Sequence, residues 1–511
     1  MSSPSAENPP STTGSAPRLR VAPSPTGDPH VGTAYMALFN LAFARQQGGS
    51  FVLRIEDTDR ARFDETSERQ LYDTLGWLGL TWDEGPDVGG PFAPYRQSER
   101  LDTYRPYVEK LIEEGHAYYC WCSTERLTAM REKQQKLKLP TGYDRLCVGK
   151  TQEERAELEG YSETPVVRML VPEDAPTTFE DVIRGTVSAP LPDDQVILKA
   201  DGFPTYHLAV VVDDHEMGIT HVVRGEEWIS STPKHVLLYR WLGLEAPKFA
   251  HMPLLRNQNK SKISKRKNPE ARLTWFQEQG YLPEAVVNFL GLLAYPPAKG
   301  ESGEDVEKFT VEEFSREFAW DKVNTVGPIF DLKKLEWLNG AWIRGLELAD
   351  LSARVLPYLQ ADGVLGEDPG AEDLARLESI AELIQTRMNL LTEASALVRP
   401  FYVADEELEI AEDARAGLKD TAGEVLDAAL AALEPLAAAT GEGNQWHAAE
   451  IERVLREAIV DGMGIKPRLA FGPLRTAVSG QKISPPLFES MEILGRDSTL
   501  GRLRALRSSL A

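Results

Sequence analysis

Cysteine is scarce in this chain, whose 511 residues contain only three. So few thiols exclude a disulfide framework and indicate a reducing compartment, and we therefore expect a cytoplasmic protein. Long hydrophobic runs are absent as well, because no stretch approaches the ~20 apolar residues that a membrane span requires. Residues 1–17, rich in Ser and Pro, lack the basic start and apolar core of a signal peptide. They predict a disordered tail, and we expect no membrane contact.

Positive charge is in deficit, and the formal net charge is -23. Binding to nucleic acid depends largely on counterion release when Lys and Arg meet phosphate, so this composition argues against a general nucleic-acid binder. An acidic protein still binds RNA through a local basic surface, and residues 260–267 contain Lys and Arg but no acid. Taken alone, such a run is more typical of a solvated loop.

Two loops indicate a nucleotide substrate. The first loop, residues 20–33, has the sequence RVAPSPTGDPHVGT. The second, the basic loop of residues 260–267, contains the sequence KISKR at 262–266. Pro and Gly interrupt regular structure in the first loop, which delivers His30 to the start of a helix. Gly32 lets a ligand approach the backbone there, and the free N–H groups of the helix start can bind phosphate. Together the two loops predict activation of a carboxylic acid by ATP.

The segments around these loops predict a parallel α/β sheet. Apolar residues at helical spacing predict a helix over residues 32–46, and residues 51–55 are typical of a short buried strand. Further strands are predicted over residues 204–212 and 219–223, and the Ser-Thr-Pro sequence at 231–233 predicts a helix start. Ligands bind such sheets at the carboxyl ends of the strands. Four polar side chains are expected at that edge: Ser24, Glu56, Arg224 and Glu227.

The rest of the chain has a different character. Strand-like segments at 165–171 and 182–187 indicate an insertion between the two parts of the sheet, and helical periodicity dominates after residue 325. The domains expected in chain order are a tail (1–17), a Rossmann-like α/β domain (18–97 and 204–250) with an inserted α+β domain (98–203), a region carrying the basic loop (251–324), and an all-helical region (325–511) divided near residue 395.

Five segments in order resemble the bacterial glutamyl-tRNA synthetases, which are class I enzymes. They are residues 23–32, in the place of the family's HIGH motif, then 54–59, 205–209, 223–228, and finally 262–266, in the place of its KMSKS motif. The resemblance extends from about residue 18 to the end. It implies a Rossmann-like catalytic domain, an insertion that binds the tRNA acceptor end, and a helical anticodon-binding region. It also implies the reaction: ATP-dependent activation of L-glutamate to glutamyl-adenylate, followed by transfer to the 3′ end of tRNA(Glu).

The resemblance assigns roles to individual residues. Catalysis is implied for His30, Gly32, Lys262 and Lys265, and binding of ATP, with Mg²⁺, for His30, Gly32, Glu227 and Lys265. Glutamate binding is implied for Arg20, Ser24, Glu56, Tyr206 and Arg224, with Glu56 facing the ammonium group. Arg224 favours glutamate over glutamine as the substrate, because a planar guanidinium suits a carboxylate and glutaminyl relatives carry an uncharged residue there.

The three cysteines leave two interpretations open. Some relatives bind zinc through a Cys-x-Cys pair and a later third cysteine, and here Cys120, Cys122 and Cys147 have that order. Structural zinc takes four ligands. In those relatives a histidine two positions after the third cysteine is the fourth ligand, and here Gly149 replaces it. Tyr143, however, matches a tyrosine ligand of a shorter glutamyl-transferring paralogue. The set Cys120, Cys122, Tyr143 and Cys147 either binds zinc or is a relic whose thiols are merely buried.

The resemblance further implies a monomer that binds tRNA(Glu). Arg387 falls where relatives restricted to glutamate tRNA have a base-reading arginine, and a solvated helix arginine is the alternative. Whether tRNA(Gln) is also charged stays open. The shorter paralogue, which glutamylates a modified base in aspartate tRNA, has no counterpart of residues 325–511. A catalytically silent RNA-binding descendant would be expected to have lost His30, Glu56, Arg224 or Lys265, and all four are present. A small-molecule nucleotidyltransferase would not need the additional domains.

Overall fold

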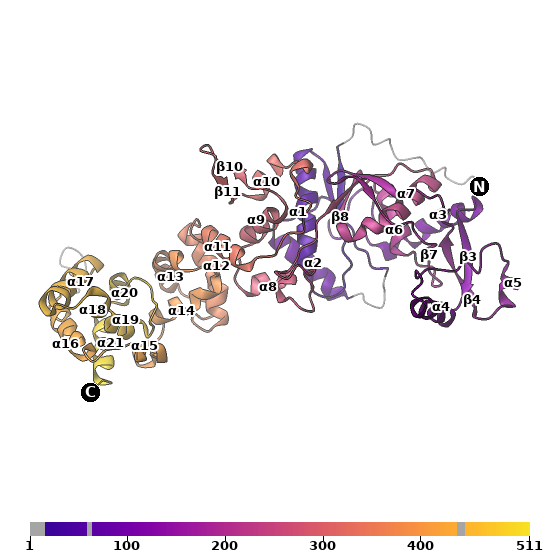
Figure 1. The fold of residues 1–511 in the computed structure, drawn as a ribbon. Helices are drawn as coiled ribbons and strands as arrows, with labels where there is room; N and C mark the ends of the chain where they lie inside the picture. The colour runs from indigo at the N-terminus through magenta and orange to yellow at the C-terminus, as the bar shows by residue number, and fades with distance from the viewer. Residues whose placement is uncertain (1–15, 59–63, 437–444, 511) are drawn as a thin grey trace. The chain divides into compact units, whose positions relative to one another are not determined.

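The computed structural model describes residues 16–58, 64–436 and 445–510 (Figure 1). These residues divide into two compact units: those within 1–277 together with 283–332, and those within 278–282 together with 333–511. Apart from residues 16 and 17, the tail predicted over residues 1–17 lies outside the described part of the chain. Among the described helices, none is both long enough and apolar enough to cross a membrane.

A six-stranded sheet organises the first unit. Its order is β2 (Ser50–Leu53), β1 (Arg18–Val21), β8 (His221–Gly225), β9 (Lys248–Met252), β5 (Thr178–Asp181) and β6 (Gly185–Ser188). All neighbours pair in parallel except β5 and β6, which form an antiparallel pair at one edge. The predicted α/β sheet is therefore confirmed, and strands far apart in the sequence meet within it. Two helices precede the insertion: α1, described next, and α2 (Glu65–Trp77).

The helix after the first loop forms where the sequence predicts it. α1 (Val31–Gln46) begins at the cap residue His30, whose Nδ1 accepts a hydrogen bond from the Gly32 N–H at 2.8 Å. The helix packs on β1, β2 and β8, and it ends before Gly48, whose φ of +62° favours glycine. The helix predicted from residues 231–233 is also present, as α7 (Thr232–Leu242).

Residues 204–212 are not a strand, and this sequence prediction was wrong. They lead into α6 (Tyr206–Glu216), in which every side chain from Leu208 to Val212 is buried. A helix enclosed by core on all sides is apolar all round and shows no periodicity, so a short apolar run does not distinguish it from a buried strand. The consequence for function is that Tyr206 begins a helix.

The segment between the two parts of the sheet contributes to two sheets. β3 (Ala117–Cys122), β4 (Tyr161–Met169) and β7 (Val196–Leu198) form a separate three-stranded antiparallel sheet, accompanied by α3 (Leu101–Glu113), α4 (Thr124–Lys136) and α5 (Gln152–Ala156). Of the second strand predicted there, over 182–187, only the last part is a strand. Residues 182–184 form the turn after β5, and β6 begins at Gly185. Residues 178–188 thus extend the main sheet.

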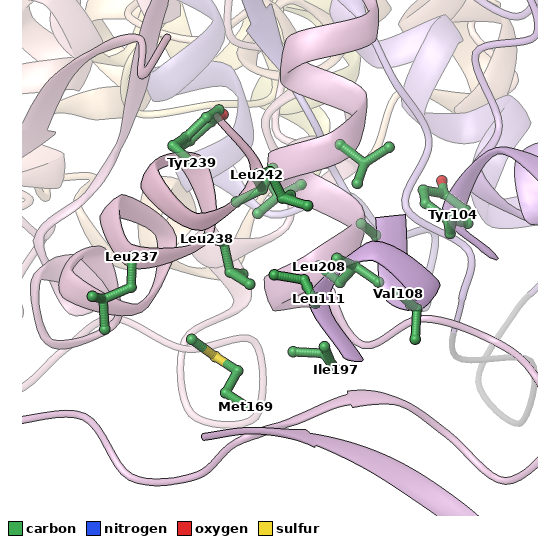
Figure 2. Close-up of a cluster of buried hydrophobic side chains, with 14 of the residues drawn as sticks. Tyr104, Val108, Leu111, Met169, Ile197, Leu208, Leu237, Leu238, Tyr239 and Leu242 are labelled. Carbon is green, nitrogen blue, oxygen red and sulfur yellow. The ribbon is translucent and has the colours of Figure 1, made fainter. Parts of the chain in front are cut away.

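A continuous hydrophobic core joins these parts (Figure 2). Side chains from α3, α6 and α7 meet Met169 of β4 and Ile197 of β7 in one cluster. The same cluster includes Val222 and Phe249 from the face of the main sheet. The inserted sheet is therefore packed against the helices that carry part of the site.

The first unit ends with helices after the basic loop, which are α8 (Leu273–Glu278), α9 (Pro283–Ala294) and α10 (Val311–Glu317), with a short pair β10 (Ala298–Lys299) and β11 (Asp305–Val306). Edge-to-face contacts of Phe39 in α1 with Phe314 and Phe318 fix this segment against the sheet's first helix.

In the second unit the described residues form helices and loops. The helices are α11 (Leu332–Ile343), α12 (Leu348–Ala361), α13 (Ala371–Ile384), α14 (Ala394–Val398), α15 (Glu412–Ala416), α16 (Ala422–Leu433), α17 (Ala448–Leu455), α18 (Pro467–Ala470), α19 (Gly472–Ser479), α20 (Leu487–Leu494) and α21 (Arg496–Ser508). The predicted helical region is confirmed. A hydrophobic cluster of its own unites residues from Val425 to Leu506, among them Leu426, Leu433 and Ile451.

Candidate active site

A cavity of about 670 Å³ opens at the carboxyl ends of β1 and β8. Its walls come from the first loop, the start of α1, the start of α6, the end of β8 and the basic loop. The lining includes every residue predicted for ATP and glutamate: Arg20, Ser24, His30, Gly32, Glu56, Tyr206, Arg224, Glu227, Lys262 and Lys265. The structure therefore brings together in one cavity residues that the sequence spreads over more than two hundred positions.

His30 is prepared to donate a hydrogen bond. Its Nδ1 accepts from the Gly32 N–H, so the proton of the neutral ring is on Nε2. Burial, together with the nearby Lys265 and Lys262, lowers the pKa of His30 to about 4. A side chain on Gly32 would come within 3.0 Å of the His30 ring, so glycine at this position keeps the capping geometry. The neutral ring is therefore suited to donate to a phosphate oxygen.

The basic loop is tied to the first loop by Lys265. Its Nζ donates to the backbone oxygen of Asp28 at 2.6 Å and to that of Thr26 at 3.3 Å. Burial lowers the pKa of Lys265. Lys262 is more exposed and forms an ion pair with Glu227 at 3.0 Å. Two cations thus face the side of the cavity that carries His30.

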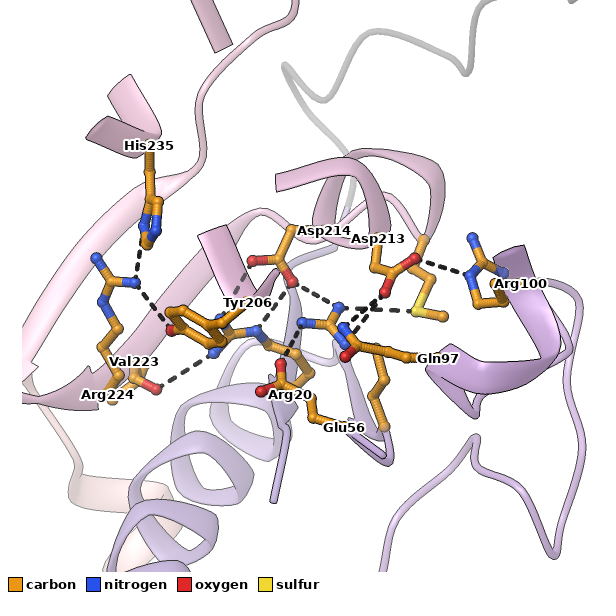
Figure 3. A network of polar contacts seen from close by, with 12 residues as sticks. Arg20, Glu56, Gln97, Arg100, Tyr206, Asp213, Asp214, Val223, Arg224 and His235 are labelled. Carbon is orange, nitrogen blue, oxygen red and sulfur yellow. Dashed lines mark hydrogen bonds and ion pairs between the residues drawn. The ribbon is translucent and has the colours of Figure 1, made fainter. Parts of the chain in front are cut away.

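A buried ion network adjoins the cavity (Figure 3). Arg20 donates from Nε and Nη2 to the two carboxylate oxygens of Asp214, at 3.0 and 3.1 Å. The fully buried Arg54 donates to Asp214 at 2.7 Å and to Glu56 at 3.4 Å. Three further side chains, Gln97, Arg100 and Tyr104, donate to the neighbouring Asp213. Because buried charges are costly unless they are paired, this network fixes Arg20 and Glu56 in position.

Glu56 has an unusual acidity for a carboxyl group. Burial raises its pKa to about 7, although the neighbouring Arg54 and Arg20 act in the opposite direction. Its backbone N–H donates to the Pro23 oxygen at 3.0 Å, which joins the end of the β2 segment to the first loop. A carboxyl group of this kind changes its charge near neutral pH.

Arg224 is surrounded by neutral groups. It donates from Nε to His251 at 3.1 Å, from Nη1 to His235 at 3.0 Å and to Tyr206 at 3.3 Å, and from Nη2 to Thr232 at 2.8 Å. Among the residues that the structure describes, it has no ion pair with a carboxylate. Its charge is therefore available to a ligand in the cavity.

Comparisons with known proteins identify the family of this chain. Residues 17–337 match a family model described as "tRNA synthetases class I (E and Q), catalytic domain", and residues 350–507 match one described as "Anticodon binding domain". A glutamate–tRNA ligase from Acidothermus cellulolyticus is 63% identical, over 95% of this chain and 94% of that protein. One from Cutibacterium acnes is 60% identical, over 96% of this chain and 98% of that protein.

The chain belongs to the class I glutamate–tRNA ligases.

A solved structure supports the same conclusion. The crystal structure of a glutamate tRNA ligase from Elizabethkingia meningosepticum, in complex with its amino acid, is similar with a TM-score of 0.83. It is 30% identical in sequence and covers 97% of this chain and 100% of its own. The predicted fold class and the recognition of the family are thereby confirmed.

The cysteine cluster is compact. The three Sγ atoms lie within 4.8 Å of one another, and Cys122 Sγ is 3.5 Å from Cys147 Sγ. The Tyr143 hydroxyl lies 3.4 Å from Cys120 Sγ and 3.3 Å from Cys122 Sγ. Tetrahedral zinc with bonds of ~2.3 Å places its sulfur ligands about 3.8 Å apart, so these four donors fit such an ion. Gly149, in the place of the usual histidine, contributes no side chain.

Arg387 belongs to the second unit. It ends a short 3₁₀ turn after α13 and is exposed, within the segment matched by the anticodon model. It also lies near Arg475, whose pKa is lowered chiefly by burial and also by Arg387.

Several residues of the site were not singled out by the sequence. Arg54 and the pair Asp213 and Asp214 form the buried network, while His235 and His251 hold Arg224. One signal was available: two adjacent acids directly follow the apolar run of α6, and acids in a buried segment require cations. The histidines carried no comparable signal, because isolated histidines on a helix and a strand have no characteristic spacing.

Proposed function

We propose that this chain activates L-glutamate with ATP and Mg²⁺ and transfers the glutamyl group to the 3′ end of tRNA(Glu), releasing AMP and pyrophosphate. The observation that carries the proposal is the cavity itself. It combines Arg224, which has no carboxylate partner in the described part of the chain, with the phosphate-directed groups His30 and Lys265. Family membership supports the same reaction.

Glutamate occupies the end of the cavity formed by β1, β8 and α6. Arg224 binds the side-chain carboxylate, and the Tyr206 hydroxyl, which accepts from Arg224, directs its own proton toward the same group. Glu56 binds the ammonium group in its ionised form. Arg20 and Ser24 complete the pocket, with Arg20 fixed by Asp214. A neutral amide in place of the carboxylate would leave Arg224 buried and unpaired, which disfavours glutamine.

ATP occupies the end of the cavity near α1 and the basic loop. The glutamate α-carboxylate attacks the α-phosphate, a bond forms to that phosphorus, and pyrophosphate leaves. The protein supplies position and charge: His30 donates to phosphate oxygen, the start of α1 offers N–H groups around Gly32, and Lys265 and Lys262 stabilise the developing negative charge. Glu227, paired with Lys262, is proposed to contact the nucleotide.

The remaining domains bind tRNA. Residues 98–203 are proposed to receive the acceptor end, residues 251–324 to meet the stem, and residues 325–511, divided near residue 395, to read the anticodon. We assign Arg387 to that reading, because it is exposed and single-stranded bases are recognised by hydrogen bonds at their edges. We further propose that the chain acts as a monomer in the cytoplasm, the compartment of its tRNA.

The decisive experiment is charging with labelled glutamate, with tRNA(Glu) and tRNA(Gln) assayed side by side. Charging of tRNA(Glu) alone would support a discriminating enzyme in which Arg387 reads the anticodon. Charging of both would keep the reaction but remove that role from Arg387. If folded protein with ATP and Mg²⁺ charges neither, the proposed reaction is wrong.

Glu56 predicts a pH dependence for glutamate use. With a pKa of about 7, the carboxyl group is mostly ionised only above that pH, so kcat/KM for glutamate should rise about tenfold between pH 6 and pH 8. Because folding raises this pKa, ionisation also lowers the stability of the ligand-free protein as pH rises through 7. Steady-state charging across this range measures the effect.

The matched control is the variant Glu56→Gln, which should charge slowly but without this pH dependence. The profile of kcat/KM for ATP at saturating glutamate should also lack it, because His30 titrates near pH 4. A rise with the same midpoint in the Glu56→Gln variant would contradict the assignment.

We also propose that Cys120, Cys122, Tyr143 and Cys147 bind a structural zinc ion. The supporting observation is the short mutual spacing of four donors of the types that zinc accepts. When bound, the ion links β3 to the loop that follows α4, and it takes no part in the reaction.

The zinc proposal predicts about one zinc ion per purified chain, as measured by mass spectrometry of the metal. The variant Cys147→Ser should lose most of it, and its thermal midpoint should fall by roughly 5 °C, because metal binding contributes to folding. Thr128→Ala, at an exposed position of the neighbouring helix α4 where the hydroxyl only donates to the Thr124 oxygen, serves as control. Metal-free protein whose thermal midpoint does not change on adding zinc would identify a relic site.

A further inference from the structure

The groups around Arg224 form a directional chain of hydrogen bonds. Arginine N–H groups only donate, so Nε2 of His251 and Nδ1 of His235 must both accept. Each imidazole is therefore neutral and carries its proton on the opposite nitrogen. His251 donates from Nδ1 to Asp181 at 2.6 Å, and His235 donates from Nε2 to His207 at 3.1 Å. Each ring is thus held by a second hydrogen bond on the side opposite Arg224.

The environment opposes protonation of these rings. His235 and His251 are almost fully buried, and burial followed by the charge of Arg224 lowers the pKa of His235 well below its ordinary value. Burial also lowers the pKa of His251, although Asp181 acts in the opposite direction. Asp181 itself accepts from the backbone N–H groups of Ile183 and Arg184 as well as from His251, so its charge is distributed over several donors.

The two arginines of the proposed glutamate pocket are held in opposite ways. Arg20 donates two hydrogen bonds to Asp214 and is therefore paired with a carboxylate. Arg224 is bound by two imidazoles and the hydroxyls of Thr232 and Tyr206, all uncharged. Figure 3 shows this difference, with Asp214 beside Arg20 and His235 beside Arg224. A carboxylate at the position of either imidazole would compete directly with a carboxylate ligand.

We propose that His235 and His251 are specificity-determining positioning residues. As neutral acceptors they fix the Arg224 guanidinium, and they leave its charge for the side-chain carboxylate of the amino acid. This inference rests on the proposed binding of glutamate by Arg224. It explains how a buried arginine is held rigidly by hydrogen bonds without its charge being neutralised by the protein.

The test compares two variants that differ only in charge. In His235→Asn, Oδ1 stands close to the position of Nδ1 and accepts from Arg224, whereas His235→Asp places a carboxylate there. Both lose the bond to His207. The nearby guanidinium keeps the introduced carboxyl group ionised. We expect the KM for glutamate to rise about threefold in the Asn variant and about thirtyfold or more in the Asp variant, with the KM for ATP changed equally little in both.

A second readout is discrimination against glutamine. The ratio of kcat/KM for glutamate to that for glutamine should fall in His235→Asp relative to His235→Asn, because the paired Arg224 no longer requires a charged ligand. Equal losses in the two variants would show a merely structural role and overturn the proposal. An Asp variant with the KM for glutamate of the Asn variant would overturn it as well.

A second pair of variants covers the case in which His235→Asp fails to fold. Thr232 accepts from Arg224 Nη2 at the first residue of α7, where a carboxylate is favoured by the helix dipole. Thr232→Asp loses the hydrogen bond that the hydroxyl donates to the Trp228 oxygen, but it should still raise the KM for glutamate far above that of Thr232→Asn. If the wild-type protein charges no tRNA with glutamate, the proposed function itself is refuted. If the wild type charges and the Asp and Asn variants differ in their KM for glutamate, the difference is due to the neutral acceptors.

Discussion

The variant Arg224→Gln should lower kcat/KM for glutamate by about 10²–10³-fold, because truncating one partner of a buried charged pair costs about 3–4 kcal/mol. The KM for ATP should change little, since Arg224 lies at the end of β8 and the phosphate-directed groups lie on α1 and the basic loop. Steady-state charging, with glutamate and ATP varied in turn, measures both effects.

The substitution also removes donors from the protein. Arg224 makes four side-chain hydrogen bonds to its surroundings, whereas a glutamine amide offers only two N–H groups. A lower thermal midpoint is therefore expected, and Arg224→Lys, which retains the charge, is the companion variant. It should lose less glutamate affinity than Arg224→Gln. Equal losses of glutamate and ATP affinity in the glutamine variant would instead indicate a folding defect.

The variant Lys265→Ala should lower kcat by about 10²–10³-fold, the size of effect expected when one group that stabilises transition-state charge is removed. Lys265 Nζ lies against the backbone of the first loop, so the cation is held where the phosphate chain of ATP is proposed to bind. The affinity for tRNA should be nearly unchanged, and it is measured separately by filter binding.

Lys267→Ala is the matched control, because Lys267 is an exposed cation of the same loop that does not line the cavity. It should charge tRNA almost normally. If both alanine variants lose turnover equally, the loop acts through its overall charge and not through Lys265. If Lys265→Ala abolishes tRNA binding, the loop must be reassigned to the tRNA surface.

Part of this site is predictable from sequence because His30 and Lys265 lie in loops with distinctive composition, whereas the roles of Arg20 and Tyr206 follow only from the resemblance to a family. Neither the Pro- and Gly-rich loop around His30 nor the basic run at Lys265 is decisive alone, but their occurrence with the other motifs in one chain order limits both the fold and the chemistry. The strands that precede Glu56 and Arg224 are short apolar runs, and their carboxyl ends follow directly from the parallel sheet.

The parts that were missed depend on tertiary contacts. The run from Leu208 to Val212 suits a buried strand or a buried helix equally, and only its neighbours α3 and α7 decide between them. The pairing of β5 with β9 joins positions far apart in the chain, which no local pattern encodes. The acceptors of Arg224 likewise come from α6, α7 and β9, so their convergence appears only in the folded protein.

The neutral surroundings of Arg224 also restrict how amino-acid recognition can change during evolution. A single substitution to an uncharged residue leaves buried acceptors at His235 and His251 with fewer donors, at about 1–3 kcal/mol for each acceptor left unsatisfied. Set against a typical domain stability of ~5–15 kcal/mol, that loss is severe. A descendant in which Arg224 is replaced is therefore expected to alter α7 and β9 together with β8. Fidelity at this position is thus protected by the instability of the intermediate sequences as well as by selection on the reaction.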